Sequence, residues 1–366
     1  MHVHLLTLSL LILGAPGPGS AAPVWVPLER EAPTGRTPWS IQLQRLDGDQ
    51  VRVEMILDGF LRVPLDRDDS RFEEIVLPGT GTTRSPGLPA LPVVRQRLLG
   101  GATKAPQILH VEVDTIRIGD VIPAPHTPRP KRCGGDWPDR TTCDATWYAS
   151  GAAFPETWAT VRRGGVLRSI PMVELTLSPF RYHPETRELE VARRLVVTLS
   201  LTPVDGATLP ARAFSRPFVE EVKRTVLDPF PVVRAGPEGA TERLLILAHD
   251  DLVPAMDGFI AWKRSSGLDV DLVPLSAVGS SWGNVAQFLS DQYHDAPVAP
   301  TYVLLVGDGE GPTTVPYVPS PLGCASDFLY TTVEGGDLYS EFLIGRFSAD
   351  DVSQAALQAQ KVIWYE

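Results

Sequence analysis

Residues 301–311 read TYVLLVGDGEG, a run of five apolar or aromatic residues followed by a glycine, an aspartate and two further glycines. A short apolar run that ends at glycine is typical of a buried strand of a parallel sheet. A dinucleotide-binding loop needs the spacing G-x-G-x-x-G and a helix directly after it, whereas this stretch has G-x-G-x-G and is followed by Pro312, Pro316, Pro319 and Pro321. The lysine and hydroxyl of a P-loop are also missing. The stretch therefore predicts a core strand that delivers Asp308, not a nucleotide site.

The sequence on both sides of this strand alternates between strand and helix patterns. Further strands are predicted at 243–249 (RLLILAH), 269–275 (DVDLVPL) and 341–347 (EFLIGRF). Apolar residues at helical spacing follow the first strand and predict a helix that ends at Gly267. A second helix is predicted after a cap at Ser280 or Ser281, and a third from Ser348, which lies three residues before Asp351. Such alternation predicts a parallel sheet with helices on both faces.

The front half of the chain has a different period. Short alternating segments bounded by proline and glycine occur at 40–46, 51–57, 108–119 and 189–201. Period-two alternation indicates antiparallel strands with one solvated face, and many of them predict a β-sandwich. Residues 206–242 are mixed and turn-rich, and we interpret them as a linker in which Arg234 or Arg243 is either an activation cleavage site or an ordinary surface arginine.

The composition and the N-terminal residues limit the classes to which this protein can belong. The 366 residues carry a formal net charge of −11, which argues against nucleic acid and anionic membranes as partners. Residues 5–13 form an apolar segment of signal-peptide length, and small residues at 20–22 suit cleavage, although Lys and Arg are absent from the first residues and a buried N-terminal strand is the alternative. No other stretch is long and apolar enough for a transmembrane helix. The sequence predicts a secreted protein with a signal peptide at 1–22.

Three cysteines remain for disulfide or thiol chemistry. In an oxidising compartment Cys133 and Cys143 are expected to close a short surface loop, which leaves Cys324 over. No histidine lies near Cys324 in a recognisable context, so a structural thiol is favoured over a nucleophile.

A second acidic segment, SDFLYTTVEGGDLYSEFLIGRF, precedes the last predicted strand. Glu334, Asp337, Tyr339 and Glu341 are spaced so that carboxylates and backbone carbonyls can converge, and calcium takes six to eight such oxygens. The EF-hand order of ligands is absent. The alternative is an acidic, solvated hairpin.

Four blocks in this half resemble, in order and spacing, the N-terminal part of the gingipain-type cysteine peptidase domain (peptidase family C25). They are YVLLVGD, SDFLY, EGGDLYSEFLIGRFSADD and KVIWYE. Upstream, residues 86–94 and 169–201 are similar to the β-sandwich prodomain of that family. The resemblance implies a signal peptide (1–22), a β-sandwich prodomain (23–205), a linker (206–242) and the N-terminal part of a caspase-like α/β peptidase domain (243–366).

The resemblance also implies chemistry. The family uses a His–Cys dyad that lies downstream of the matched region, so we expect this chain to stop before it and assign no catalytic residue. The family's structural calcium ligands fall on Asp308, Asp337 and Glu341 through their side chains and on Glu334 and Tyr339 through their backbone oxygens.

The resulting hypothesis is a secreted, calcium-stabilised cysteine endopeptidase that acts on protein or peptide substrates. It is made as a zymogen whose prodomain packs on its own peptidase domain. A surface transpeptidase of the same family and a non-catalytic binding or adhesion scaffold are the alternatives. Substrate specificity cannot be read from these residues.

Overall fold

The computed structural model describes residues 22–28, 37–67, 70–101, 103–127, 143–229, 231–232, 242–321 and 323–366. Residues 1–21 of the predicted signal peptide, Cys133 and Arg234 lie outside this range. The chain divides into two compact units: the first comprises Met1–Arg95, Gln107–Val161 and Leu175–Ser200, and the second comprises Gln96–Pro106, Arg162–Glu174 and Leu201–Glu366. No helix in the described ranges is long and apolar enough to cross a membrane.

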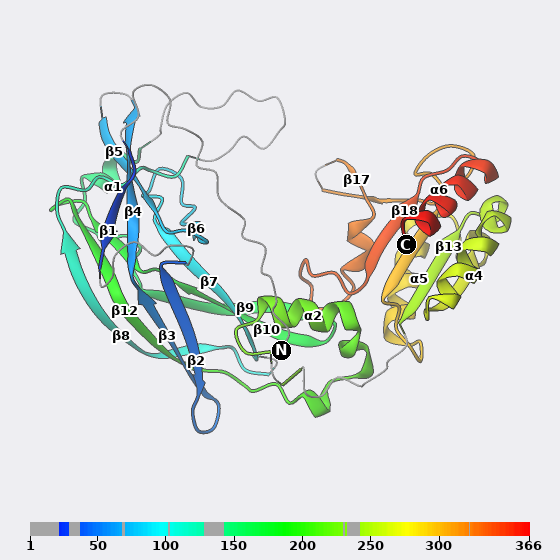
Figure 1. The fold of residues 1–366 in the computed structure, drawn as a ribbon, viewed down its shortest axis with the longest axis horizontal. Helices are drawn as coiled ribbons and strands as arrows, with labels where there is room; N and C mark the ends of the chain where they lie inside the picture. Colours follow the sequence, from blue (N-terminus) through cyan, green and yellow to red (C-terminus); the bar gives the residue numbers. More distant parts are fainter. Residues whose placement is uncertain are drawn as a thin grey trace. The chain divides into compact units, whose positions relative to one another are not determined.

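The first unit and the segments next to it are built from strands, as the period-two alternation predicts (Figure 1). Three sheets have the strand orders β1-β4-β5, β6-β7-β10-β9 and β11-β12-β3-β2, and β8 also pairs with β12. In β3, Val51, Val53, Met55 and Leu57 are buried and alternate with less buried residues, so one face of the strand packs into a core. The bounds are β1 Val24–Pro27, β2 Trp39–Arg45, β3 Gln50–Leu57, β4 Gly59–Arg67, β5 Ser70–Val76, β6 Gly81–Thr82, β7 Pro92–Leu99, β8 Gln107–Ile118, α1 Ala145–Tyr148, β9 Ala159–Leu167, β10 Ile170–Leu177, β11 Phe180–His183 and β12 Glu188–Ser200.

The second unit contains a four-stranded parallel sheet of order β14-β13-β15-β18. All four strands match the predicted segments, and the apolar run that begins residues 301–311 forms β15, one of the two inner strands. The bounds are η1 Gly206–Thr208, η2 Ala211–Phe214, α2 Arg216–Thr225, β13 Arg243–Ala248, η3 Asp250–Met256, α4 Asp257–Ser265, β14 Asp269–Pro274, η4 Leu275–Ala277, α5 Trp282–His294, β15 Tyr302–Val306, β16 Val318–Pro319, β17 Ala325–Ser326, η5 Phe328–Thr331, β18 Leu343–Phe347 and α6 Val352–Tyr365. The predicted fold class, all-β followed by α/β, is confirmed.

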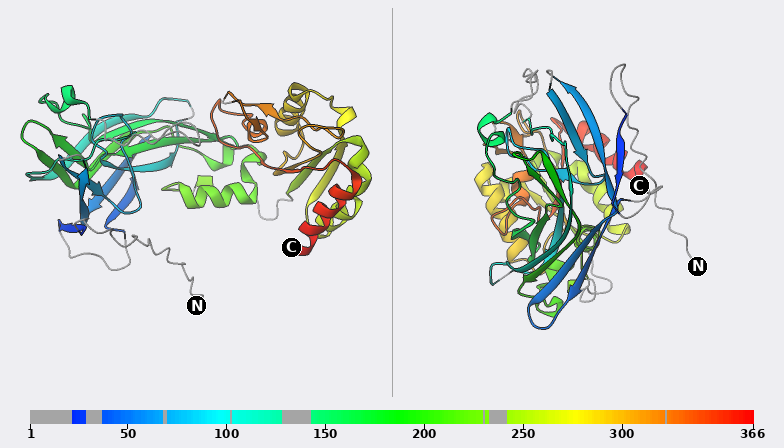
Figure 2. Two further views of the ribbon diagram at one scale, coloured as in Figure 1. Left: turned by 90° about the horizontal axis from the view of Figure 1, so that it is seen from above. Right: turned by 90° about the vertical axis from the view of Figure 1, so that its left-hand side faces the viewer.

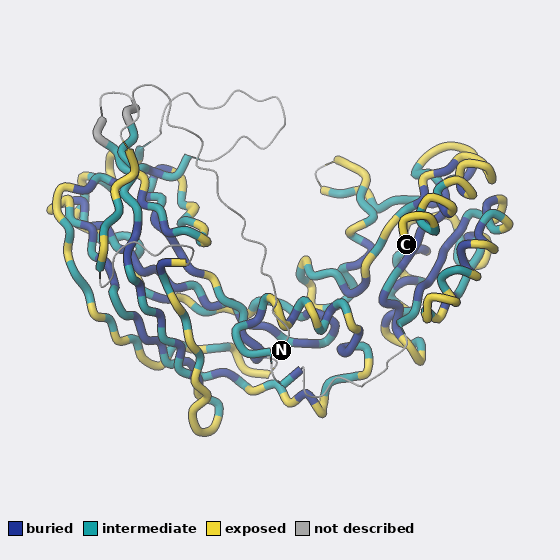
Figure 3. The backbone as a smooth tube through the Cα atoms, viewed as in Figure 1, coloured by how far each residue is buried: buried dark blue, intermediate teal, exposed yellow. Residues whose placement is uncertain are grey.

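Helices cover both faces of the parallel sheet. On one face, Leu244 and Ile246 of β13 pack with residues of η3, α4 and α6. On the other face, Leu245 and Leu247 pack with residues of α5 and η5. Figure 2 shows α6, drawn in red, along the sheet, and Figure 3 shows buried strands between helices whose outer sides are exposed. Alternate residues of one strand thus serve two cores, which explains why its sequence is apolar throughout.

Two helix starts test the cap assignments. Ser281 caps α5, because its hydroxyl accepts from the backbone N–H of Asn284 at 3.1 Å. The predicted start of the last helix at Ser348 is wrong: Asp351 caps α6 and accepts from the N–H of Gln354 at 2.8 Å. An aspartate directly before the first helical residue reaches the free N–H groups that a serine three residues earlier does not.

Residues 206–242, which we interpreted as a linker, begin with the ordered elements η1, η2 and α2. Helix α2 buries Phe218 and Val222, four residues apart on one face, against Leu167, Ile170 and other apolar residues of the second unit. Residues 233–241 lie outside the described ranges.

Candidate functional site

The carboxyl end of β15 places Asp308 at the edge of the sheet where ligands of open α/β folds bind. Gly307 precedes it with φ +144°, and a Cβ there would lie 2.5 Å from the carbonyl oxygen of Thr313, so no other residue fits. The backbone carbonyl of Asp308 accepts from the N–H of Val315 at 2.8 Å. In the described part before residue 328, the chain then forms the short strands β16 and β17 and no helix.

Arg346 of β18 holds this strand end in place. Its guanidinium donates to both carboxylate oxygens of Asp327, at 2.8 and 2.7 Å, and to the carbonyls of Gly307 and Val315, at 2.9 and 2.7 Å. The two charged side chains are 12% and 24% exposed. With Asp308 they line a cavity of about 360 Å³. The Nη2 of Arg346 also donates to the carbonyl of Pro316 at 3.3 Å. Because five acceptors surround the guanidinium, Arg346 acts as a structural clamp.

The acidic loop, residues 332–342, leads into β18 and ends at a buried carboxylate. Glu341 is 0% exposed, and its Oε2 accepts from the backbone N–H of Arg168 at 2.5 Å and from the Tyr293 hydroxyl at 3.3 Å. Its Oε1 is buried and has no hydrogen-bond partner among the described residues. Burial raises the pKa of the Glu341 carboxyl to about 8. An ionised Glu341 with one oxygen unpaired is costly to bury, and either a proton or a cation would relieve that cost.

The other two carboxylates of the acidic loop also accept from the β9–β10 hairpin. Asp337 Oδ2 accepts from the N–H of Val166 at 2.8 Å. Both carboxylate oxygens of Glu334 lie within 3.0 Å of the Ser169 hydroxyl, and its Oε2 accepts from the Tyr293 hydroxyl at 2.7 Å. Glu334 and Glu341 therefore share one phenol, and all three carboxylates face donors from 166–169.

The structure brings the predicted ligands together only in part. Glu334 and Glu341 meet at Tyr293, and Asp337 accepts from the N–H of Tyr339 at 2.7 Å within the same loop. Asp308 lines the cavity with Arg346 instead. Among the described residues, no three or more His, Cys, Asp or Glu side chains form a group arranged to hold a metal ion. The donor chemistry of the loop suits calcium, but its geometry here is that of a hydrogen-bonded contact.

Arg168 is the residue of this site that sequence reasoning missed. It lies at the tip of the β9–β10 hairpin and is 1% exposed, although arginine is rarely buried. The local signal is weak: an arginine stands between apolar residues in GGVLRSIPM, and nothing nearby shows that its partners lie 44 to 173 residues away in sequence.

The thiols of the described residues show no catalytic arrangement. Cys324 is exposed and lies 3.0 Å from the Ser320 hydroxyl, and none of its hydrogen-bond partners is a histidine. Cys143 forms no disulfide within the described residues, but Cys133 lies outside them, so their pairing stays a prediction.

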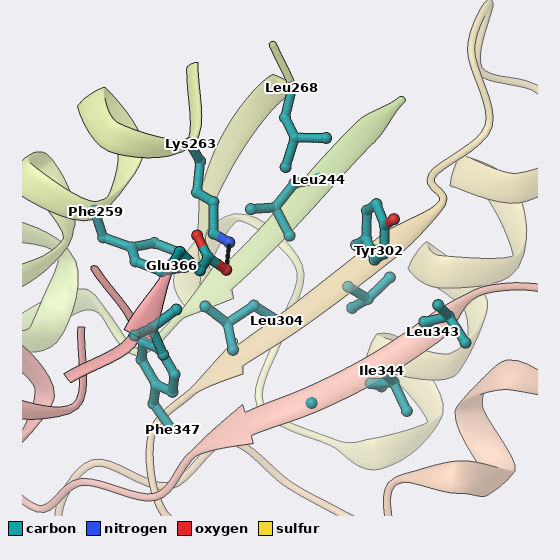
Figure 4. A pocket seen from close by; sticks show the side chains of 13 residues that line it. Leu244, Phe259, Lys263, Leu268, Tyr302, Leu304, Leu343, Ile344, Phe347 and Glu366 are labelled. Carbon is teal, nitrogen blue, oxygen red and sulfur yellow. Dashed lines mark hydrogen bonds and ion pairs between the residues drawn. The ribbon is translucent and has the colours of Figure 1, made fainter. Parts of the chain in front are cut away.

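A groove of about 440 Å³ lies on the sheet face next to β13, β15 and β18 (Figure 4). Its walls are mainly apolar, with Leu304 and Ile344 on neighbouring strands. The charged residues that line it, Lys263 and Glu366, pair with each other at 2.5 Å.

Comparison with known families finds two matches that are consecutive along the chain. The C25 propeptide matches residues 36–226, and peptidase family C25 matches residues 238–366. The hairpin and α2 fall in the first match, and Tyr293, the acidic loop and Arg346 fall in the second. Only residues 227–237 lie between them.

Curated relatives agree with these matches. Gingipain R2 of Porphyromonas gingivalis (strain W83) is 26% identical over 287 residues, which cover 76% of this chain and 38% of the relative. Gingipain R1 of Porphyromonas gingivalis is 25% identical over 284 residues, 76% of this chain and 28% of the relative. The chain thus spans well under half the length of these relatives.

Two solved structures are similar at lower levels. The complex of the Porphyromonas gingivalis RgpB pro- and mature domains gives a TM-score of 0.43 at 19% identity, covering 53% of this chain and 100% of that chain. A structure described as an insight into zymogenic latency of gingipain K from Porphyromonas gingivalis gives 0.41 at 19% identity, covering 50% of this chain and 100% of that chain.

Proposed function

Because the chain belongs to peptidase family C25 and carries the propeptide of that family ahead of its peptidase region, we propose that it is a cysteine endopeptidase made as a zymogen, with proteins or peptides as substrates. In this class of enzyme a thiolate attacks the peptide carbonyl. The observation that carries the proposal is the order of the two matched regions, separated by only residues 227–237. That order suits a latent precursor released by cleavage between them.

The test uses the protein expressed from its complete coding sequence. We expect it to be inactive as made, and to hydrolyse peptide substrates after cleavage between the two regions and removal of the propeptide. Iodoacetamide should abolish that hydrolysis, and a serine-directed inhibitor should not. If the separated peptidase region shows no iodoacetamide-sensitive hydrolysis, the enzyme proposal is refuted and a non-catalytic scaffold is favoured.

We place the activating cleavage at Arg234 rather than Arg243. Arg243 begins β13 and pairs with Asp269 of β14, so its backbone lies within the sheet. Its guanidinium also donates to Asp271 and Gln292, each at 2.7 Å. A peptidase needs an extended, accessible segment, which a paired core strand does not offer. Arg234→Ala should block maturation and leave the precursor intact on a gel, whereas Arg243→Ala should leave the cleavage position unchanged. A new N-terminus at Leu244 would contradict this assignment.

We also propose that the acidic loop binds calcium through the side chains of Asp337 and Glu341 and the backbone oxygens of Glu334 and Tyr339, with Asp308 as the further predicted ligand. The unpaired, buried Oε1 of Glu341 supports this proposal. Bound calcium would supply positive charge to carboxylates that otherwise repel one another.

A ligand that binds only the folded state stabilises it by mass action, so millimolar calcium should raise the melting temperature, and magnesium should raise it less. Asp337→Asn should remove most of the calcium-dependent shift. Asp295→Asn, at an exposed carboxylate after α5, is the matched control and should retain it. Superimposable melts of the wild-type protein with calcium and with chelator would refute the site.

We further propose that the protein is exported, on the strength of the apolar segment at 5–13 and the small residues at 20–22. Mass spectrometry of the exported precursor, or of its released propeptide, should find an N-terminus near Ala22. Recovery of intact Met1 on the exported precursor would contradict export by this route.

A further inference from the structure

A cavity of about 470 Å³ in the second compact unit has a basic and apolar lining, although the whole chain carries a formal net charge of −11. Its lining includes Arg168 and Arg212, and none of the described residues that line it is an aspartate or a glutamate. The walls are largely apolar and include Phe214, Pro297 and Val298. A cavity of this size, with apolar walls and a few polar groups, has the usual form of a small-molecule site.

Arg168 presents a donor to this cavity that the protein does not use. The side chain is 1% exposed. Its Nε donates to the carbonyl of Arg212 at 2.6 Å, and its Nη1 donates to the carbonyls of Pro300, at 2.9 Å, and Glu341. Among the described residues, no acceptor contacts Nη2, the other terminal nitrogen. Because buried polar groups are normally hydrogen-bonded, Nη2 is available to an acceptor inside the cavity.

Arg212, in the short helix η2, supplies a second guanidinium. Its Nε donates to the Ser169 hydroxyl at 3.0 Å, and its Nη2 lies 3.9 Å from a carboxylate oxygen of Glu334, beyond hydrogen-bond distance. No acceptor in the described part of the chain contacts its Nη1. A second cationic donor of the same cavity is therefore free.

The two guanidiniums lie close enough to influence each other. They lie over the same ring, that of Tyr293, with Arg168 at 5.6 Å and Arg212 at 5.3 Å from its centroid. Burial lowers the pKa of the Arg168 guanidinium, acidic neighbours raise it, and the positive charge of Arg212 lowers it again. A bound anion would favour the charged form of both side chains.

Two buried hydroxyls add a third donor. Ser215 and Thr301 both line the cavity and are 8% and 3% exposed. Their oxygens lie 3.0 Å apart, so one hydroxyl donates to the other. Each hydroxyl has a single hydrogen, and that of the accepting hydroxyl has no acceptor among the described residues. The free polar groups of the cavity are thus donors, which match a ligand rich in acceptors.

We propose that this cavity binds an organic carboxylate. The carboxylate would accept from Arg168 Nη2, Arg212 Nη1 and the free hydroxyl, since its two oxygens offer about four acceptor positions and suit guanidinium donors. The apolar walls favour a ligand with an apolar body over an inorganic anion. Such a carboxylate belongs to a free small acid or to the C-terminus of a peptide. The proposal makes no use of a catalytic thiol or of calcium, so it stands apart from the proposed function.

The test is isothermal titration calorimetry on the uncleaved full-length protein at one fixed calcium concentration. Arg168, Arg212 and Ser215 lie in the propeptide match and Thr301 in the peptidase match, so the whole precursor is needed. N-acetylphenylalanine should bind saturably at one site. Its amide should bind about tenfold or more weakly, because hydrogen bonds to an ionised acceptor are the stronger ones. Inorganic phosphate, which has no apolar body, should also bind more weakly.

Two variants locate the binding. Arg212→Gln should weaken binding of N-acetylphenylalanine by about tenfold or more, and Thr301→Val, which keeps the shape but removes the hydroxyl, by roughly two- to tenfold. Arg216→Gln is the matched control: it removes the same charge from an exposed arginine outside the lining and should leave the affinity unchanged. Far-UV circular dichroism checks that each variant is folded, and Thr301→Val carries the test if Arg212→Gln is not.

The two sources of the carboxylate are separated by N-acetyl-Ala-Ala-Phe. Binding as tight as that of N-acetylphenylalanine, or tighter, assigns the cavity to peptide C-termini, whereas loss of binding assigns it to free small acids. Absence of saturable binding by both acids would overturn the proposal. Equal affinity of the acid and its amide, phosphate binding as tightly as the acid, or unchanged affinity in the folded variants at Arg212 and Thr301 would overturn it as well.

Discussion

Replacing Arg346 by methionine removes the clamp at the carboxyl ends of β15 and β18 and keeps much of the side-chain volume. The change leaves Asp327 as an unpaired carboxylate that is 24% exposed and removes donors from the carbonyls of Gly307 and Val315. Breaking a buried ion pair on one side costs about 3–5 kcal/mol. Since Asp327 keeps some access to water, we expect a loss at the lower end of this range, about 3 kcal/mol in the free energy of unfolding.

Urea unfolding of the purified protein, followed by tryptophan fluorescence, measures this loss. A double-mutant cycle isolates the pair: Arg346→Met with Asp327→Asn should be less destabilising than the sum of the single changes, by at least about 1 kcal/mol. Arg162→Met is the control, because its exposed ion pair should contribute about 0–1 kcal/mol. A loss below about 1 kcal/mol for Arg346→Met, or strict additivity in the cycle, would show that the clamp is not a structural element.

Three further changes test the fold. Ser281→Ala should cost about 1 kcal/mol of unfolding free energy through the lost cap of α5, and Ser280→Ala should cost much less. Leu305→Ala, at a fully buried position of β15, should cost about 2–5 kcal/mol in the same urea assay, and a smaller loss would mean that the core collapses onto the cavity. The hydrogen bond from the Ser353 hydroxyl lowers the pKa of the Asp351 carboxyl, so its stabilisation is present at neutral pH and is lost as pH falls through that lowered pKa. Melting curves between neutral pH and about pH 3 should show a smaller decline for Asp351→Asn, which still caps but does not titrate; parallel declines would contradict this.

Sequence reasoning succeeded where local residues decide the outcome. Each strand of the parallel sheet is an apolar run between turn residues, and Leu244 to Leu247 alternate between two cores because helices cover both faces. The start of α5 was predicted from the same kind of local rule, since Ser281 contacts a backbone group only three residues away.

Reasoning failed where distant residues decide the outcome. Helix α2 was interpreted as part of a linker because FVEEVKR is rich in charge, although the four-residue spacing of Phe218 and Val222 is the signal of a buried face. The hairpin tip was assigned only to a strand-rich prodomain. The partners of Arg168 are set by tertiary packing, which neither the alternation of β9 nor the composition of the tip encodes.

The contact between Arg168 and Glu341 spans 173 residues of sequence. At about 5–20 residues per second of N-to-C synthesis, the acidic loop leaves the ribosome roughly nine to thirty-five seconds after the hairpin that contacts it. Three of the loop's carboxylates thus meet donors on a segment that was made long before them. The entropy of closing this loop depends on its length and not on the order of synthesis, so the order of synthesis affects only when the contact can form. In this molecule the β9–β10 hairpin is therefore translated before the acidic loop that it contacts.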